Sequence, residues 1–178
     1  MKRLETKKLS LAALLCALSA VVAVIGCVFD MADLTACTVA SVTVAICAIE
    51  LGGKYPYLVF AVTGAILFLF FPSATVTWYF IMFFGYYPIV KKYLDRLPKI
   101  LARVLKFVLF NAAMFMLYFL MKKLLFAAEA EEGKSLLIML VLFANVFFAV
   151  YDFSLSVFLT AYMKYYRKRW GIDKFMLK

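Results

Sequence analysis

The chain has 178 residues, of which 67% are hydrophobic, and its formal net charge at pH 7 is +10. This apolar share is far above that of a soluble domain, so the composition excludes an ordinary water-soluble fold and predicts an integral membrane protein. Histidine is absent and the four cysteines form no CxxC pair, which argues against a zinc site, a histidine-ligated haem and a serine–histidine dyad. We expect no cofactor, no bound metal and no enzymatic activity.

Six apolar segments follow one another along the chain, separated by short charged or turn-forming stretches. They predict a single all-α membrane domain, residues 1–178, built as a bundle of six transmembrane helices at 9–29, 31–49, 55–71, 74–90, 100–126 and 135–163. The third and fourth segments are separated only by Pro72 and Ser73, and each has 17 residues, near the lower limit for crossing a bilayer. For these two segments, a re-entrant pair is the alternative to two full crossings.

The basic residues are distributed unevenly between the two sides that six crossings define. Seventeen of the twenty lie in 2–8, 54, 91–106 and 164–178, and three lie in the stretch 122–134. The positive-inside rule therefore predicts that both termini are cytoplasmic and that the protein is a multi-pass protein of the plasma membrane. The rule explains the net charge without nucleic acid as a partner, and the same flanks favour anionic lipid.

The first segment carries small residues at helical spacing, with Ala13 and Ala17 on one stripe. Small residues four apart let a second helix approach closely in lipid. The stripe predicts contact either with other helices of this chain or with a separate membrane subunit. Val24–Cys27 also resembles a bacterial lipobox, but the apolar stretch is longer than that of a usual signal sequence, so we expect an uncleaved first helix.

Residues 91–106 form a basic segment with an amphipathic pattern. Leucines recur at steps of three and four residues, while Arg96, Lys99 and Arg103 recur on the opposing side together with Lys106. Pro98 can occupy the first turn of a helix, so a helix can restart there. The pattern favours a helix that lies on anionic lipid at the interface, with docking of a cytoplasmic partner as the alternative.

Asp152 is the only acidic residue deep inside an apolar segment. An ionised carboxylate in hydrocarbon costs about 3 kcal/mol or more, so such a residue usually faces a partner, a bundle interior or a polar cavity. Asn145 lies seven residues earlier on nearly the same helix face, and Asn111 on the fifth segment is a candidate partner across the bundle. These side chains predict either an interhelical polar clamp or a ligand or ion site.

Aromatic and polar residues also gather at the rim that is expected to face outward. Trp78 and Tyr79 lie near the start of the fourth segment, and Glu129 lies in the last outer loop. Together they predict either the mouth of a small-molecule site or, for the two aromatic residues, ordinary anchoring at the membrane interface.

Six short helices, cytoplasmic termini, a length of 178 residues and the Ala13/Ala17 stripe together resemble the substrate-binding S component of an energy-coupling-factor (ECF) vitamin transporter. The resemblance implies a non-enzymatic subunit that binds a vitamin-like small molecule through its outer loops and last three helices. It also implies that the Ala13/Ala17 stripe packs on a coupling membrane subunit and that two partner ATPases supply the energy. The run Gly85–Pro88, followed by the basic segment, resembles small membrane proteins of Gram-positive bacteria as well.

Two hypotheses from other classes stand beside this one. The first is a structural or assembly protein whose polar residues only clamp helices together. The second is an ion or proton pathway built on Asp152, which would need a relay partner that the sequence does not identify. The chain has no Gly-rich phosphate-binding loop, so any active transport would need an ATPase partner.

Overall fold

The computed structural model describes residues 2–29, 33–124 and 134–166, and all regular secondary structure in these residues is helical. The elements are, in chain order, α1 (Lys2–Val28), α2 (Asp33–Glu50), α3 (Tyr55–Phe70), α4 (Thr75–Tyr79), the π-helical turn η1 (Phe80–Phe84), α5 (Tyr87–Leu94), α6 (Lys99–Leu124), α7 (Lys134–Ala161) and the π-helical turn η2 (Tyr162–Tyr166).

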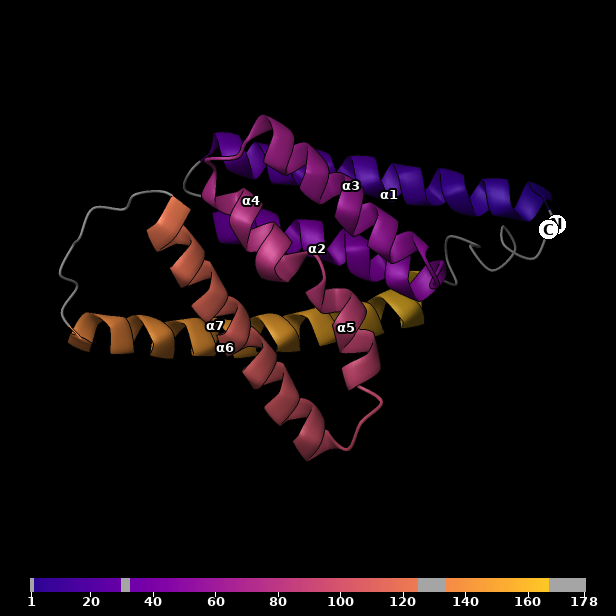
Figure 1. Ribbon diagram of the computed structural model, residues 1–178. Coiled ribbons are helices and arrows are strands. Elements are labelled where there is room, and N and C mark those ends of the chain that lie inside the picture. The colour runs from indigo at the N-terminus through magenta and orange to yellow at the C-terminus, as the bar shows by residue number, and fades with distance from the viewer. Residues whose placement is uncertain (1, 30–32, 125–133, 167–178) are drawn as a thin grey trace.

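The first three helices form the most closely packed part of the molecule. α1 packs along both α2 and α3, and Figure 1 shows the three helices side by side along their lengths. The side chains on their contact faces are small: Ala23 of α1 and Ala40 of α2 are both fully buried there. Within this interface the Ser19 hydroxyl donates a hydrogen bond to the carbonyl oxygen of Ala40 at 3.3 Å. Small side chains thus allow the close helix packing that lipid favours.

A tight turn connects α2 to α3, where the sequence predicts one. Gly52 and Gly53 have φ values of 60° and 54°, in the left-handed region that glycine adopts without a Cβ penalty. The Lys92 ammonium donates to the carbonyl oxygen of Ala48 at 2.5 Å, which satisfies one of the carbonyls left free at the end of α2. The turn therefore returns the chain at once to the side of α2.

The fourth apolar segment is not one continuous α-helix, so the expected span at 74–90 is wrong in detail. It consists of α4, the turn η1 and the start of α5, with the break at Gly85 and Tyr86. The amide of Gly85 donates to the carbonyl oxygen of Phe80 at 2.7 Å, five residues back, which closes the π-turn. A Cβ at Gly85 would overlap the ring of Phe60, so the absence of a side chain permits this bend.

α6 and α7 are long helices that cross each other at the side of the molecule away from α1 (Figure 1). α7 is fastened to α2 by a buried hydrogen bond from the Tyr151 hydroxyl to the Ser41 hydroxyl at 2.8 Å. Four helical stretches among the described residues are long and apolar enough to cross a membrane, namely Glu5–Val28, Asp33–Glu50, Lys99–Leu120 and Met139–Tyr165. α3, with 16 residues, is shorter than these.

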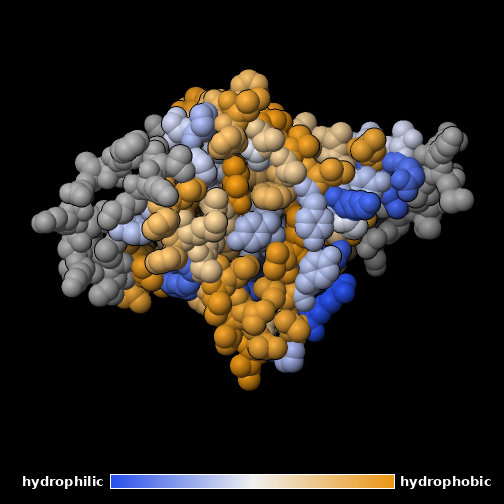
Figure 2. Space-filling model, in the orientation of Figure 1, coloured by the Kyte–Doolittle hydropathy of each residue, from blue (hydrophilic) through white to orange (hydrophobic). Residues whose placement is uncertain are grey.

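The start of α1, the end of α2, the start of α3 and the end of α7 lie at one end of the bundle (Figure 1). Figure 2 shows hydrophilic atoms gathered at this end and a largely hydrophobic surface over much of the rest of the visible face. The basic flanks at 2–8 and at Lys54 and the end of α7 therefore lie at the same end of the bundle (Figure 1).

The basic segment 91–106 is divided between two helices. α5 ends at Leu94 and α6 begins at Lys99, directly after Pro98, where the sequence allows a restart. The expectation that Lys106 lies with the other basic residues on an exposed side is wrong, because its side chain is buried, as is that of Lys91. Leu101 and the neighbouring apolar side chains of α6 are instead exposed.

We predict that Gly26→Ala destabilises the protein, because a Cβ at this position would overlap that of Ala36 where α1 crosses α2. Overpacking of this kind costs about 1–3 kcal/mol. The matched control is Gly64→Ala in α3, where the added methyl would lie 3.5 Å from Ile81 Cγ1, an ordinary van der Waals contact. Alanine also favours the helix over glycine by about 1 kcal/mol. The thermal midpoint of the detergent-solubilised protein should drop in the first variant only; equal midpoints would contradict the close crossing.

Candidate functional site

A cluster of ionised side chains joins α5, α6 and α7 around Asp152, the acidic residue that the sequence singles out. Its carboxylate contacts the Lys91 ammonium directly, lies 3.3 Å from the Lys106 ammonium and accepts a hydrogen bond from the Tyr87 hydroxyl at 2.6 Å. Lys106 also contacts a carboxylate oxygen of Asp95 at 2.5 Å. We call these five residues the ion cluster. Lys91 and Lys106 are buried, and the two aspartates balance their charges, as a buried cation requires.

Sequence reasoning missed the partners of Asp152. Lys91 and Lys106 are 61 and 46 residues away from it along the chain, and both belong to a segment whose other basic residues are exposed. One sequence feature did indicate a partner: an isolated carboxylate in an apolar helix is costly unless a cation lies nearby. The sequence does not indicate which of the six basic residues of 91–106 would supply it.

Asn111 of α6 and Asn145 of α7 form a reciprocal pair. Each amide nitrogen donates to the oxygen of the other side chain, at 2.9 and 3.2 Å. Each also donates to a carbonyl oxygen one turn earlier in its own helix. The structure thus brings together the two asparagines that the sequence pairs, but it places Asp152 in a separate contact. All donors of this pair are used within the protein, which makes it a clamp between the two helices.

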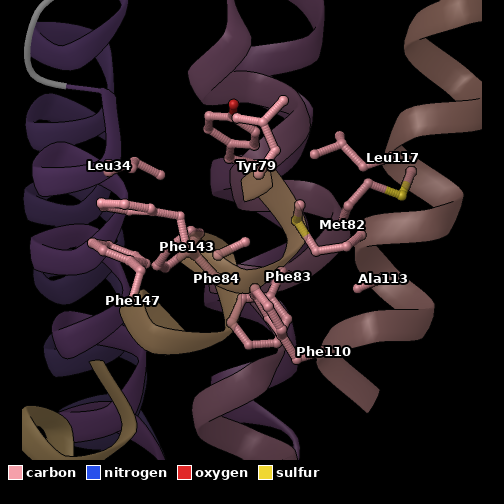
Figure 3. Close-up of a pocket in the computed structure, with 13 residues that line it drawn as sticks. Leu34, Tyr79, Met82, Phe83, Phe84, Phe110, Ala113, Leu117, Phe143 and Phe147 are labelled. Atoms are coloured by element: carbon pink, nitrogen blue, oxygen red, sulfur yellow. The ribbon is translucent and has the colours of Figure 1, made fainter. Parts of the chain in front are cut away.

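A cavity of about 450 Å³ opens between η1, α6 and α7, near Leu34 at the start of α2. We call it the outer cavity, because the start of α2 lies at the end expected to face outward. Figure 3 shows aromatic and thioether side chains converging on it from several helices. Its lining is Leu34, Tyr79, Met82, Phe83, Phe84, Phe110, Ala113, Met114, Leu117, Leu140, Phe143, Ala144 and Phe147. Among the described residues of this lining, Tyr79 alone carries a polar side chain.

A second cavity, of about 510 Å³, lies between α6 and α7 on the side of the ion cluster. We call it the inner cavity. Both acidic members of the cluster and Lys106 line it, as do the exposed basic residues Lys99 and Arg103. The two cavities therefore differ sharply in chemistry, the outer one apolar and the inner one ionic.

A pair of aromatic rings separates the two cavities. Phe110 lines the outer cavity and Phe148 lines the inner one. The two rings are stacked, with centroids 4.6 Å apart and an angle of 8° between their planes. Phe83 packs edge-on against both of them. This arrangement is a common favourable geometry for aromatic contacts, and it closes the space between α6 and α7 midway along the helices.

The remaining ligand candidates from the sequence do not share one site. Trp78 donates its indole hydrogen to the carbonyl oxygen of Pro72 at 2.9 Å and packs edge-on against Phe68. Tyr79 lines the outer cavity. Glu129 lies outside the described residues. Trp78 is thus engaged in the α3–α4 turn and is not among the described residues that line the cavity of Tyr79.

The docking candidates lie on exposed surfaces. Ala13 and Ala17 are exposed on α1, whereas the neighbouring stripe with Ala12 and Ala23 is buried. Of the two alternatives drawn from the sequence, packing of the Ala13/Ala17 stripe against other helices of this chain is therefore not seen among the described residues. Arg96, next to the cluster residue Asp95, has its guanidinium 5.7 Å from the centre of the Tyr93 ring, a cation–π contact.

Comparison with protein-family models, with curated proteins and with solved structures gives no match for this chain.

We predict that Asp152→Asn lowers the free energy of unfolding by about 3–5 kcal/mol, because the buried Lys91 ammonium loses its close carboxylate partner and keeps only Asp95 at 3.9 Å. Lys91→Met introduced into the same chain should recover part of this loss. The matched control is Asp95→Asn, whose carboxylate is 49% exposed and whose removal should cost about 1 kcal/mol or less. Unfolding followed by circular dichroism in mixed micelles measures these changes; strictly additive effects of the Asp152 and Lys91 substitutions would contradict the cluster.

Proposed function

We propose that this chain is a non-enzymatic, membrane-embedded subunit that binds a small molecule in the outer cavity and docks through α1 onto an energising partner. In this role it corresponds to the S component of an ECF transporter, with a coupling membrane subunit and two ATPases as partners. The proposal includes six crossings of the plasma membrane with both termini in the cytoplasm.

The outer cavity is the observation that carries this proposal. A volume of about 450 Å³ lies in the range of small-molecule sites, which are mostly apolar with a few placed polar groups. The described lining has no charged side chain and one hydroxyl, that of Tyr79. Six aromatic side chains, three of them from η1 and α6, supply flat surfaces. We therefore propose an uncharged ligand with at least one ring and one hydrogen-bonding group.

The exposed stripe on α1 supports the docking half of the proposal. Ala13 and Ala17 form an exposed stripe of small residues, and the large apolar residues Leu14 and Leu18 beside them are 63% and 48% exposed. A helix of another subunit could approach α1 closely along this stripe, as small residues allow in lipid. The opposite face of α1 is already occupied by α2 and α3.

The alternative, a structural or assembly protein, has its own supporting observation. The ion cluster and the Asn111–Asn145 pair both join neighbouring helices, as a purely architectural design would require. In that case the outer cavity holds only lipid chains, and blocking it changes nothing but stability. Ligand content therefore separates the two hypotheses.

We predict that Ala144→Phe, which fills the outer cavity from α7, lowers the amount of bound small molecule about tenfold or more. The matched control is Ala65→Phe on the exposed face of α3, away from both cavities. Protein purified from its native membrane is extracted with organic solvent, and the extract is examined by mass spectrometry. A non-lipid molecule should accompany the wild type and the control but not Ala144→Phe; identical extracts from all three would contradict the ligand site.

We predict that Ala17→Leu prevents docking while the fold is retained, since the larger side chain blocks close approach to the exposed Ala13/Ala17 stripe without touching the core. Ala65→Leu on α3 is the control, because it adds the same side chain to another exposed helix face. The measurement is a pull-down in mild detergent with mass spectrometry of co-purifying membrane subunits and ATPases. Equal recovery of these partners with both variants would contradict docking through α1.

A further inference from the structure

The inner cavity combines an ionic lining with an apolar wall, and the ligand proposed for the outer cavity contacts neither of them. Its ionic lining comprises three basic side chains, Lys99, Arg103 and Lys106, and two acidic ones, Asp95 and Asp152. Its remaining wall includes aromatic and aliphatic side chains from both α6 and α7. A cavity of this kind suits an amphiphile better than either a purely polar or a purely apolar molecule.

Lysines of the ion cluster neutralise the acidic part of this lining. Asp152 contacts Lys91 and Lys106, and Asp95 contacts Lys106 at 2.5 Å. Within the described part of the chain, no carboxylate lies within ion-pair distance of Lys99 or Arg103. The positive charge that the cavity still offers to a ligand is therefore concentrated at these two residues, and it favours an anion.

The apolar wall continues from the cavity onto the outer surface of α7. Phe107 and Phe148 lie deeper, with ring centroids 5.2 Å apart, and Phe153 at the cavity is 70% exposed. In a helix that crosses a membrane, such an exposed ring faces hydrocarbon. A free inorganic anion would leave this wall without a partner, whereas an acyl chain would cover it.

The position of the cavity matches a lipid headgroup. It lies where α5 connects to α6, and Figure 2 shows hydrophilic atoms there directly beside the hydrophobic projection formed by the first turns of α6. This connection belongs to a basic segment that the positive-inside rule assigns to the cytoplasmic side. The cytoplasmic leaflet is also the one in which anionic lipids attract juxtamembrane basic residues.

We infer that the inner cavity binds one acidic phospholipid of the cytoplasmic leaflet. Lys99 and Arg103 contact its phosphate, and an acyl chain runs along Phe153. The site is distinct from the outer cavity, because the stacked rings of Phe110 and Phe148 separate the two. It also does not depend on the identity of the small molecule proposed there.

The test is a titration of the full-length, detergent-solubilised protein with phosphatidylglycerol, followed by native mass spectrometry. The wild type should bind phosphatidylglycerol more tightly than phosphatidylcholine, and inorganic phosphate should not displace it. One basic residue near an anionic surface changes affinity about fivefold, so the variant Lys99→Gln/Arg103→Gln should raise the Kd for phosphatidylglycerol about thirtyfold. Phe153→Ser should weaken binding of the same lipid without changing its preference over phosphatidylcholine.

The control is Lys8→Gln/Lys54→Gln, which removes the same charge from α1 and from the α2–α3 turn, outside the inner cavity. Its Kd should stay within about threefold of the wild-type value. Equal weakening in both double variants would show diffuse attraction and overturn the site. Displacement by inorganic phosphate would overturn the lipid as its occupant, and so would equal binding of the two lipids. As a check that needs no variant, phosphatidylglycerol should raise the thermal midpoint of the wild type more than phosphatidylcholine does.

Discussion

The contact of the Asp152 carboxylate with two lysines fixes how the last three helices meet. Asp152 belongs to α7, Lys91 to α5 and Lys106 to α6, so one carboxylate joins all three. Removing one of these charges would deprive an oppositely charged group of its partner. A charge without a partner is costly in an environment that cannot solvate it. A charged cluster is an unusual core for a membrane bundle, and here it takes the place that small-residue packing has between α1, α2 and α3. The two halves of the molecule are thus held by different forces.

The cluster also explains why α6 and α7 leave space between them. Four polar side chains and the stacked pair Phe110–Phe148 hold the helices at fixed points. The outer cavity lies toward one end of these contacts and the inner cavity toward the other. Because the aromatic pair lies between them, an uncharged ring-bearing molecule and a lipid phosphate can be proposed for the same pair of helices without overlap.

The amino-acid sequence predicts the helical class and the position of most helices, because long apolar runs bounded by charges leave few alternatives in a membrane. The reciprocal pair of Asn111 and Asn145 is also predictable, since both interrupt apolar helices. The arrangement around Asp152 is not. Helical periodicity assigns faces within one segment, whereas Lys91 and Lys106 are buried by contact with a helix that lies far away in the sequence. The π-turn at Phe80–Phe84 is equally hidden, because Gly85 and Pro88 indicate a bend but not its hydrogen bonding. Of the ligand candidates, Tyr79 lines the outer cavity. The sequence does not distinguish the other lining residues from ordinary apolar core residues.

Small-molecule binding is tested most directly by a cryo-electron microscopy structure of the protein purified from its native membrane into lipid nanodiscs, with a rigid antibody fragment as a marker. We expect compact, ring-shaped density in the outer cavity, between the side chains of Phe83, Phe110 and Phe143 and close to the Tyr79 hydroxyl. Elongated density continuous with the surrounding acyl chains would identify the occupant as bulk lipid. That result would contradict the small-molecule site and leave the structural role as the better explanation of the fold.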